Sequence, residues 1–279
     1  MSAEFLTIEG RKVRIAQAGD PANEPVLLVH GIGRSLEDWD ELGDRLASDY
    51  RVIRIDTPGF GFSDPLPGPV THHSLGQGFA PVLDALGETR PVHTIGNSLG
   101  GSTIMEFAVA HPDRVKSLTL VNSAGFGKTV TPLLRMLAIP ILGWLLTRHV
   151  SHQAARMFER AIFVNKSMAT KERVDLAVRV GNHPGNGTFM YRMVRALGTL
   201  RGVRPEWRER LLAAVSRHDR PVLVIWGDHD QILPADHMET ALKTFPHASS
   251  HLFRNIGHMP MIETPDETAQ IIQDFLAKV

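Results

Sequence analysis

The sequence predicts an α/β fold in which a mostly parallel sheet is flanked by helices and carries an inserted helical cap. Two patterns lead to this prediction. First, unbroken runs of β-branched and aliphatic residues alternate with segments of helical spacing, and such runs are typical of parallel strands buried on both faces. Second, the stretch 126–216 contains helical patterns and is too long for a loop.

The expected elements follow one another as strands joined through helices. The chain opens with a hairpin of Phe5–Ile8 and Val13–Ala18, in which Glu9 and Gly10 supply the turn. Further strands are expected at Val26–Val29, Val52–Ile55, Val92–Ile95, Val115–Val121, Val222–Trp226 and Ser250–Phe253. Helices are expected near Leu36–Ser48 and Ser74–Leu86, from Ser98 onward, and at Ala235–Thr244 and Pro265–Lys278.

One long stretch interrupts this alternation after Val115–Val121. It shows helical patterns at Leu133–Leu137, Gln153–Ile162 and Lys171–Val180. We therefore expect a core domain of residues 1–125 and 217–279 and a helical cap of residues 126–216. No repeat and no Gly/Ser-rich linker divides the chain into independent domains.

The composition excludes several classes of protein. Of the 279 residues, 43% are hydrophobic and 22% are charged, which are ordinary values for a globular protein. Lys plus Arg and Asp plus Glu number 30 each, so the chain as a whole has no basic field for nucleic acid or an anionic membrane. The absence of cysteine excludes disulfides, thiolate metal sites and a cysteine nucleophile.

Motifs for cofactors, metals and membrane insertion are also missing. The chain has no phosphate-binding G-x-x-x-x-G-K-[ST] loop, and its histidine pairs lack the H-E-x-x-H arrangement of zinc sites. We therefore expect no cofactor and no metal. The N-terminus shows no signal-peptide pattern, and the longest apolar segment, Ile139–Leu146, is too short to span a bilayer. These features predict a cytoplasmic protein without a transmembrane segment.

The most informative motif is Gly96-Asn97-Ser98-Leu99-Gly100-Gly101, which lies between an expected strand and an expected helix. A serine on such a turn is a nucleophile elbow, with its hydroxyl lifted above the sheet. Side chains at Gly96 and Gly100 are expected to collide with the neighbouring strand and helix. The helix start also directs free N–H groups toward charge that develops beside Ser98. Ser98 is therefore the candidate nucleophile.

A serine hydroxyl needs a base to take its proton and a third group to orient that base. His258 is the candidate base because it follows a glycine in a loop between the last strand and the last helix. Asp230 and Asp228 are alternatives for the acid, since both lie beyond the end of the strand Val222–Trp226. The chain order Ser98, Asp, His258 is the one expected for an elbow-type hydrolase.

An oxyanion intermediate needs two donors fixed in advance. The backbone N–H of Leu99, the residue after the candidate nucleophile, is one candidate. The second is expected from the loop after Val26–Val29, where we nominate the N–H of Ile32, with Gly33 as the alternative. His30 is expected to brace this loop by hydrogen bonds.

Five motifs together resemble those of α/β-hydrolase-fold serine hydrolases with a helical cap. They are the oxyanion loop His30–Gly33, the D-x-P-G-x-G-x-S turn Asp56–Ser63, the elbow Gly96–Gly101, the W-G-x-x-D loop Trp226–Asp230 and the G-H-x-x-x-x-E-x-P loop Gly257–Pro265. The resemblance implies the α/β-hydrolase fold and favours Asp230 over Asp228 as the acid.

The subfamily is less sharply defined. A serine nucleophile argues against haloalkane dehalogenases and epoxide hydrolases, which use aspartate. The G-N-S-x-G-G elbow is similar to that of carbon–carbon hydrolases acting on ring-cleavage products. Those enzymes usually carry an H-G-G-G-P-G oxyanion loop and a Trp after the histidine, whereas this chain has His30-Gly31-Ile32-Gly33 and Met259. Carboxylesterases and small lipases tolerate these choices.

The sequence therefore predicts a serine esterase that cleaves a small-molecule carboxylic ester through an acyl-enzyme. The alternatives are a carbon–carbon bond hydrolase and a hydrolase-like ligand-binding protein. The segment Thr131–His149 carries more apolar residues than one buried helix stripe requires. Either this helix packs on the main domain, or part of it, including Trp144, lines a pocket for an apolar acyl group.

Overall fold

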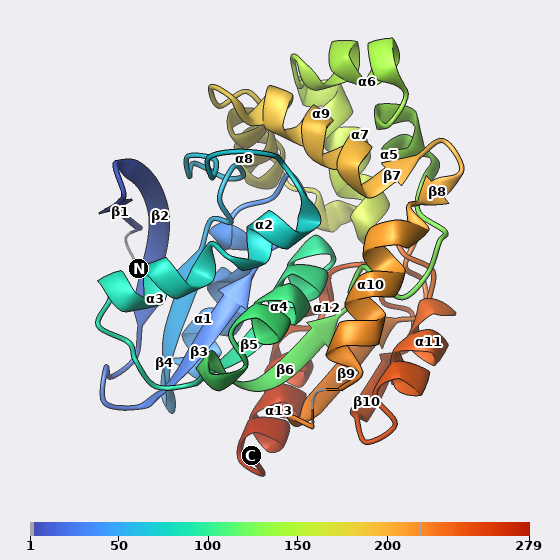
Figure 1. Cartoon of the computed structure of the whole chain (residues 1–279). Helices are drawn as coiled ribbons and strands as arrows, with labels where there is room; N and C mark the ends of the chain where they lie inside the picture. Colours follow the sequence, from blue (N-terminus) through green and yellow to red (C-terminus); the bar gives the residue numbers. More distant parts are fainter. Residues whose placement is uncertain (1–2, 218) are drawn as a thin grey trace.

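The computed structural model describes residues 3–217 and 219–279 and contains one eight-stranded sheet below a group of helices (Figure 1). The strand order is β1-β2-β4-β3-β5-β6-β9-β10. Strands β3 to β6, β9 and β10 are parallel, and β2 pairs antiparallel with both β1 and β4. The bounds are β1 Glu4–Ile8, β2 Arg11–Ala18, β3 Glu24–Val29, β4 Tyr50–Ile55, β5 Val92–Asn97, β6 Val115–Val121, β9 Val222–Gly227 and β10 Ser249–Phe253.

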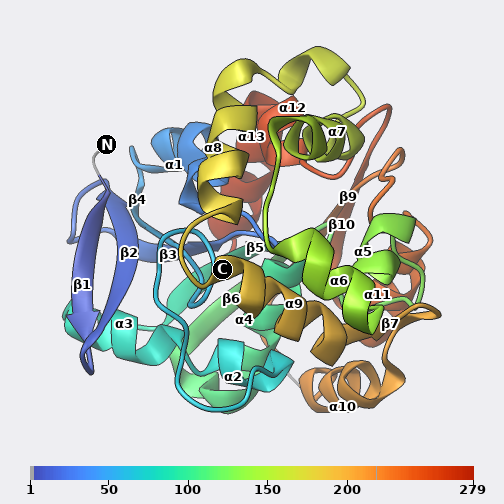
Figure 2. The ribbon, with the colours of Figure 1, turned by 90° about the horizontal axis from the view of Figure 1, so that it is seen from above.

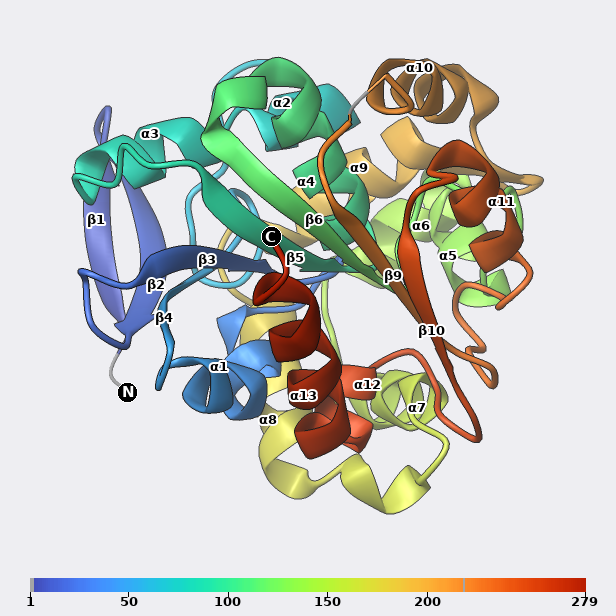
Figure 3. The same cartoon turned by 90° about the horizontal axis from the view of Figure 1, so that it is seen from below.

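The sheet is buried on both faces, as the apolar runs predict. Every residue of β5 and β9 is buried. Figure 3 shows α3 (Phe79–Ala85), α4 (Leu99–Ala110) and α10 (Pro205–Val215) on one face, and α1 (Asp40–Leu46) and α13 (Pro265–Leu276) on the other. Because the parallel strands all end at the same edge, the loops after β3, β5, β9 and β10 meet there.

The expected N-terminal hairpin is confirmed. β1 and β2 pair in register from Glu4 with Ile15 to Ile8 with Arg11. The two turn residues, Glu9 and Gly10, have φ angles of 50° and 77°. Positive φ at both positions is what a two-residue turn between twisted strands requires.

Three expected helices are each divided in two. Residues 36–48 form a 3₁₀ turn, η1 (Leu36–Trp39), followed by α1. Residues 74–86 form α2 (His72–Gly76) and α3, because Pro81 in a continuous helix would lose a hydrogen bond and clash with the carbonyl of residue 77. Pro140 divides 131–149 in the same way, into α5 (Pro132–Leu137) and α6 (Pro140–Thr147).

The inserted segment is mostly helical. It continues with α7 (His152–Ile162), η3 (Lys166–Met168), α8 (Lys171–Gly181) and α9 (Asn186–Leu197), and then a short hairpin of β7 (Gly198–Thr199) and β8 (Gly202–Val203). We call α5 to α9 the cap helices, because they lie together over the carboxyl edge of the sheet (Figure 1), with α6 packed beside α9 (Figure 2). α10, which also falls within 126–216, packs against α4, so the exact extent of a cap domain stays a prediction.

The remaining elements are η2 (Pro112–Arg114), α11 (His237–Thr244) and α12 (Pro260–Glu263). The last of these is a single turn just after His258 that the sequence pattern does not show. No helix within residues 3–217 and 219–279 is long and apolar enough to cross a membrane.

Candidate active site

Ser98 occupies a strained turn between β5 and α4. Its φ and ψ angles are 55° and −120°, a backbone conformation that non-glycine residues rarely adopt. The turn is held from both sides, because the Ser98 N–H donates to Val121 O (3.1 Å) and the Ser98 carbonyl accepts from Ala124 N (2.8 Å). The surrounding fold therefore fixes the strained residue.

The glycines around Ser98 are required by close packing. A Cβ at Gly96 would lie 2.6 Å from the carbonyl carbon of Gly100, and a Cβ at Gly100 would collide with the carbonyl oxygen of Val29. A side chain at Gly96 or Gly100 would thus collide with its neighbours, as expected. Because both residues are glycine, the start of α4 can lie directly against the loop after β3.

Asp230 and His258 are hydrogen-bonded to each other, although 28 residues separate them in the chain. His258 Nδ1 lies 2.7 Å from Asp230 Oδ2. The other carboxylate oxygen, Oδ1, accepts from the backbone N–H groups of Ile232 (2.7 Å) and Leu233 (2.9 Å). Oδ2 also accepts from Asn122 Nδ2 at 2.7 Å. This carboxylate is therefore fixed in orientation and aimed at the imidazole.

Asp228 faces a different group. Its Oδ1 accepts from the Asn255 N–H (2.7 Å) and lies 2.6 Å from His229 Nδ1. The hydrogen bond with His229, more than any other contact, lowers the pKa of Asp228. Of the two alternatives for the acid, the structure brings Asp230, and not Asp228, to His258.

The loop that carries His258 is attached to both the sheet and the cap helices. The His258 N–H donates to the carbonyl of Ile162 at the end of α7 (2.9 Å), and the His258 carbonyl accepts from Asn97 Nδ2 (3.0 Å). The Glu263 carboxylate accepts from the N–H groups of Gly257 and Val164, each at 2.8 Å. Burial raises the pKa of this carboxyl.

The loop after β3 lies beside Ser98. A Cβ at Gly31 would be 3.1 Å from the Ser98 Cβ. The Arg34 N–H donates to the Gly31 carbonyl (3.3 Å), which closes a turn with Ile32 and Gly33 in its centre. Ile32 lines the same cavity as Ser98. Leu99 is the first residue of α4, where backbone N–H groups have no partner within the helix.

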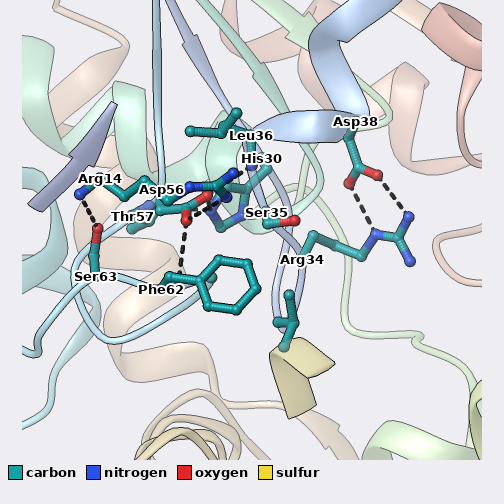
Figure 4. A network of polar contacts seen from close by, with 12 residues as sticks. Arg14, His30, Arg34, Ser35, Leu36, Asp38, Asp56, Thr57, Phe62 and Ser63 are labelled. Carbon is teal, nitrogen blue, oxygen red and sulfur yellow. Dashed lines mark hydrogen bonds and ion pairs between the residues drawn. The ribbon is translucent and has the colours of Figure 1, made fainter. Parts of the chain in front are cut away.

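His30 braces this loop, as expected. Its Nε2 accepts from the Thr57 N–H (3.0 Å), so Nδ1 carries the proton and donates to the Gly31 carbonyl (2.8 Å). Beside it, the buried Asp56 accepts from the Leu36 N–H (2.7 Å) and the Phe62 N–H (2.8 Å) (Figure 4). The turn Asp56–Ser63 is thus attached to the loop after β3 through Asp56 and Thr57.

Arg34 connects the loop to the cap helices. Its Nε and Nη2 donate to the two Asp38 oxygens at 2.8 and 2.6 Å (Figure 4), and its Nη1 pairs with Glu159 on α7. Burial alone would lower the pKa of Arg34, but the carboxylates of Asp38 and Glu159 raise it. The guanidinium is therefore occupied by two carboxylates of the protein itself.

Three cavities meet around Ile32 and Leu134. The smallest, about 10 Å³, is lined by both Ser98 and His258. A second cavity of about 70 Å³ is lined by Ser98 and reaches toward β7 and β8. The largest of these three, about 250 Å³ and called the largest cavity below, lies among the cap helices and is lined almost entirely by apolar side chains such as Leu133, Leu137, Ala155, Phe158 and Met190.

The fold is shared with known proteins. A family model described as alpha/beta hydrolase fold matches residues 24–265. The chain is an α/β hydrolase. The chain is 28% identical to Lipase 1 of Psychrobacter immobilis, over 99% of this chain and 84% of the lipase. It is 29% identical to 2-hydroxy-6-oxononadienedioate/2-hydroxy-6-oxononatrienedioate hydrolase 1 of Dechloromonas aromatica, over 91% of this chain and 86% of that protein. The crystal structure of a membrane phospholipase A matches with a TM-score of 0.82 and 26% identity, covering 99% of this chain and 86% of that chain.

The structure of this α/β hydrolase does not place Trp144 in a pocket. Its side chain is 46% exposed, and its ring stacks with Arg148, whose guanidinium carbon lies 4.6 Å from the ring centroid. Trp144 is not among the residues that line the three cavities, whereas Leu146 and Thr147 of the same helix line the largest one. Trp144 therefore faces outward from α6, which packs against α9.

Sequence reasoning missed three residues that hold this site. Asn122 supports Asp230, Asn97 supports the His258 loop, and Glu263 joins that loop to the cap helices. Asn122 directly follows β6, and Asn97 ends β5. Both asparagines could have been predicted as site residues, because each is a polar residue at the carboxyl end of a parallel strand.

A second polar cluster lies on α4, one helical turn beyond the elbow. His72 Nδ1 lies 3.0 Å from Glu106 Oε1, and His72 Nε2 lies 2.8 Å from Ser102 Oγ. Arg210 of α10 also pairs with Glu106. Burial would raise the pKa of Glu106, but hydrogen bonds from His72 and Arg210 outweigh it and lower that pKa to about 2. Within the described part of the chain, no group of three or more His, Asp or Glu side chains could hold a metal ion.

Proposed function

We propose that this α/β hydrolase cleaves carboxylic esters through a Ser98-His258-Asp230 triad. The observation that carries the proposal is the 2.7 Å contact between His258 and Asp230, made by a histidine that lines the same cavity as Ser98. Such an arrangement of nucleophile, base and orienting acid recurs on unrelated folds and is recognised by its geometry.

The reaction follows from which nitrogen of His258 is free. The Nδ1–H donates to Asp230, so Nε2 is left to accept the proton of the Ser98 hydroxyl as its oxygen attacks the ester carbonyl carbon. The N–H groups of Leu99 and Ile32 receive the negative charge on the carbonyl oxygen. His258 then gives its proton to the leaving alcohol and activates a water molecule, which releases the acid and regenerates Ser98.

The proposed substrate is an ester with an apolar acyl group. The largest cavity is lined by aliphatic and aromatic side chains, and each methylene buried there adds about 0.8 kcal/mol to binding. Among the described residues that line it, Arg34 is the one cation, and its guanidinium is already paired with Asp38 and Glu159. Two of the similar proteins, a lipase and a phospholipase A, have names that denote ester hydrolysis.

The second candidate is hydrolysis of a carbon–carbon bond, and Arg135 favours it. Arg135 lines the cavity of about 70 Å³ next to Ser98 and uses its Nε to donate to Val130 O at 2.9 Å. Its terminal nitrogens could receive the carboxylate of a ring-cleavage product. The similar hydrolase of Dechloromonas aromatica is named for dioate substrates of this kind.

Labelling with a fluorophosphonate tests whether Ser98 is a nucleophile. We expect Ser98→Ala to abolish labelling and to lower ester turnover by at least roughly three orders of magnitude. Ser117→Ala, which removes another buried hydroxyl, is the matched control and should label normally. Normal labelling of a folded Ser98→Ala variant would refute the mechanism, and a wild-type protein that neither labels nor turns over substrate would be a binding protein.

Comparing substrates separates the two chemistries. We expect turnover of p-nitrophenyl esters of medium chain length and little turnover of a ring-cleavage dienoate. Arg135→Gln should leave the ester reaction nearly unchanged. If the dienoate is the better substrate and Arg135→Gln raises its KM, the carbon–carbon hydrolase is the correct assignment.

A further inference from the structure

The two parts of the molecule carry opposite charge. Residues 126–216 contain 15 Lys and Arg but only 5 Asp and Glu, so the rest of the chain contains 15 against 25. The neutral total therefore hides an excess of about ten positive charges on the inserted segment and an equal negative excess on the remainder. From Arg114 to Phe158 the sequence has no acidic residue at all.

Within this basic segment, the helix α6 exposes apolar side chains. α6 lies at the top of the molecule in Figure 1, away from the sheet. Ile141 is 76% exposed, Leu145 53% and Trp144 46%. Ile141 and Leu145 are four residues apart and so share one side of the helix. We call these three residues the α6 face.

The largest cavity reaches the surface close to this face. Leu146, the next residue of α6, both lines the cavity and is 43% exposed. Met157 of α7 also lines it and is 61% exposed. Apolar molecules held against the α6 face would therefore have a short way into the cavity.

We propose that the α6 face docks on an anionic lipid surface. Exposed aliphatic and aromatic residues beside basic residues are the features by which helices bind at the headgroup level of a bilayer. The Trp144–Arg148 stack places an amphipathic ring and a cation together, as at membrane interfaces. The charge separation orients the protein, because the lipid attracts the inserted segment and repels the remainder.

A second copy of the chain fits this face less well. A symmetric dimer through α6 would place the α6 face against its twin. That contact would bring two surfaces with the same positive excess together, at an electrostatic cost. An anionic lipid surface offers both apolar depth and the opposite charge.

Sedimentation with vesicles tests the proposal without any substrate, so its outcome does not depend on the chemistry at Ser98. The vesicles contain phosphatidylcholine and phosphatidylglycerol in equal parts, with pure phosphatidylcholine as the reference. We expect binding to the anionic vesicles that weakens as salt rises. Ile141→Ser/Leu145→Ser should weaken binding at least roughly ten-fold by removing two apolar anchors. Arg148→Glu should weaken it roughly twenty-fold, since each basic residue strengthens binding about five-fold.

Matched controls lie elsewhere on the molecule. Phe5→Ser removes a side chain of similar exposure (54%) from β1, and Lys278→Glu reverses an exposed charge near the C-terminus. Both should bind vesicles like the wild type, and thermal unfolding should show all variants folded. The proposal is overturned if the wild type ignores anionic vesicles, or if the Ile141/Leu145 variant binds as tightly as the wild type. A third result would also overturn it. In that result the wild type binds no vesicle and forms a dimer that does not depend on salt, and the Ile141/Leu145 variant is a monomer.

Discussion

Replacing Asp230 and Asp228 separately by asparagine tests the most specific feature of the site. The two residues lie in one loop, two positions apart, and differ in what they contact. Asp230 receives two backbone N–H groups on Oδ1 and faces His258 with Oδ2. In Asp230→Asn the amide oxygen is held by the two backbone donors, so the NH₂ group faces His258.

The amide then donates to His258 Nδ1, so the proton of the ring moves to Nε2. In that tautomer Nε2 cannot accept the proton of Ser98. We expect kcat to fall by roughly four orders of magnitude, which is the effect of the equivalent change in a well-studied serine protease. The NH₂ group also meets Asn122 Nδ2, a donor facing a donor, which costs about 1–3 kcal/mol of stability.

Asp228→Asn keeps an oxygen that can accept from the Asn255 N–H, and it does not touch His258. We expect kcat to change by no more than roughly three-fold. The assay is kcat at saturating ester for both variants, with thermal unfolding to show that each is folded. A loss at Asp228→Asn as large as that at Asp230→Asn, or a folded Asp230→Asn variant with nearly full kcat, would refute this reasoning.

Three further predictions follow from the cavity and from the polar contacts. Ala155→Phe fills part of the largest cavity, so kcat/KM for decanoate esters should fall several-fold relative to butyrate, while the outward-facing Trp144→Ala should leave this ratio unchanged. Asn122→Gly keeps the positive φ of 45° without strain but removes a donor to Asp230, so kcat should fall roughly ten-fold with little change in KM. Burial lowers the pKa of His72 below 6.5, so its contribution to stability is complete above that pH and is lost as pH falls below it. The pKa of Glu106 is about 2 instead of 4.5, so its contribution to stability is lost as pH falls from about 4.5 to 2. Unfolding temperatures measured over a pH series should show both losses of stability. The loss that belongs to Glu106 should be smaller in Glu106→Gln.

Much of the sheet could be predicted because buried parallel strands leave a strong sequence signal. Val115–Val121 has the expected bounds, and the other strands expected for the large sheet differ by one or two residues at one end. The short strands β7 and β8 were not expected. The order of strands in the sheet could not be read from these runs, because it depends on which strands pair across long stretches of chain. Pro81 and Pro140 are chemical signals for a helix break. The prediction missed both breaks because the apolar pattern continues on either side of each proline and suggests one unbroken helix.

The candidate site was predictable where it rests on short motifs at strand ends. Ser98 lies at the predicted turn, and Asp230 and His258 lie together because β9 and β10 are neighbours. Glu263 belongs to the motif Gly257–Pro265 and Asn122 follows a strand end, so both positions carried a signal. Their partners could not be predicted, because the contacts of Asn122 with Asp230 and of Glu263 with Val164 join segments far apart in the chain. The outward direction of Trp144 depends on how α6 packs on α9, which no local pattern contains.

The attachment of His258 to Ile162 has a consequence for engineering this protein. Inserted segments in hydrolases invite exchange between relatives, as if they were interchangeable parts. Here the end of α7 and the residue Val164 hold the loop of the proposed general base, through the Ile162 carbonyl and the Glu263 carboxylate. A chimera that replaces the whole insertion would therefore remove part of the scaffold of the base. A productive exchange keeps 159–164 with the recipient and replaces the helices on either side.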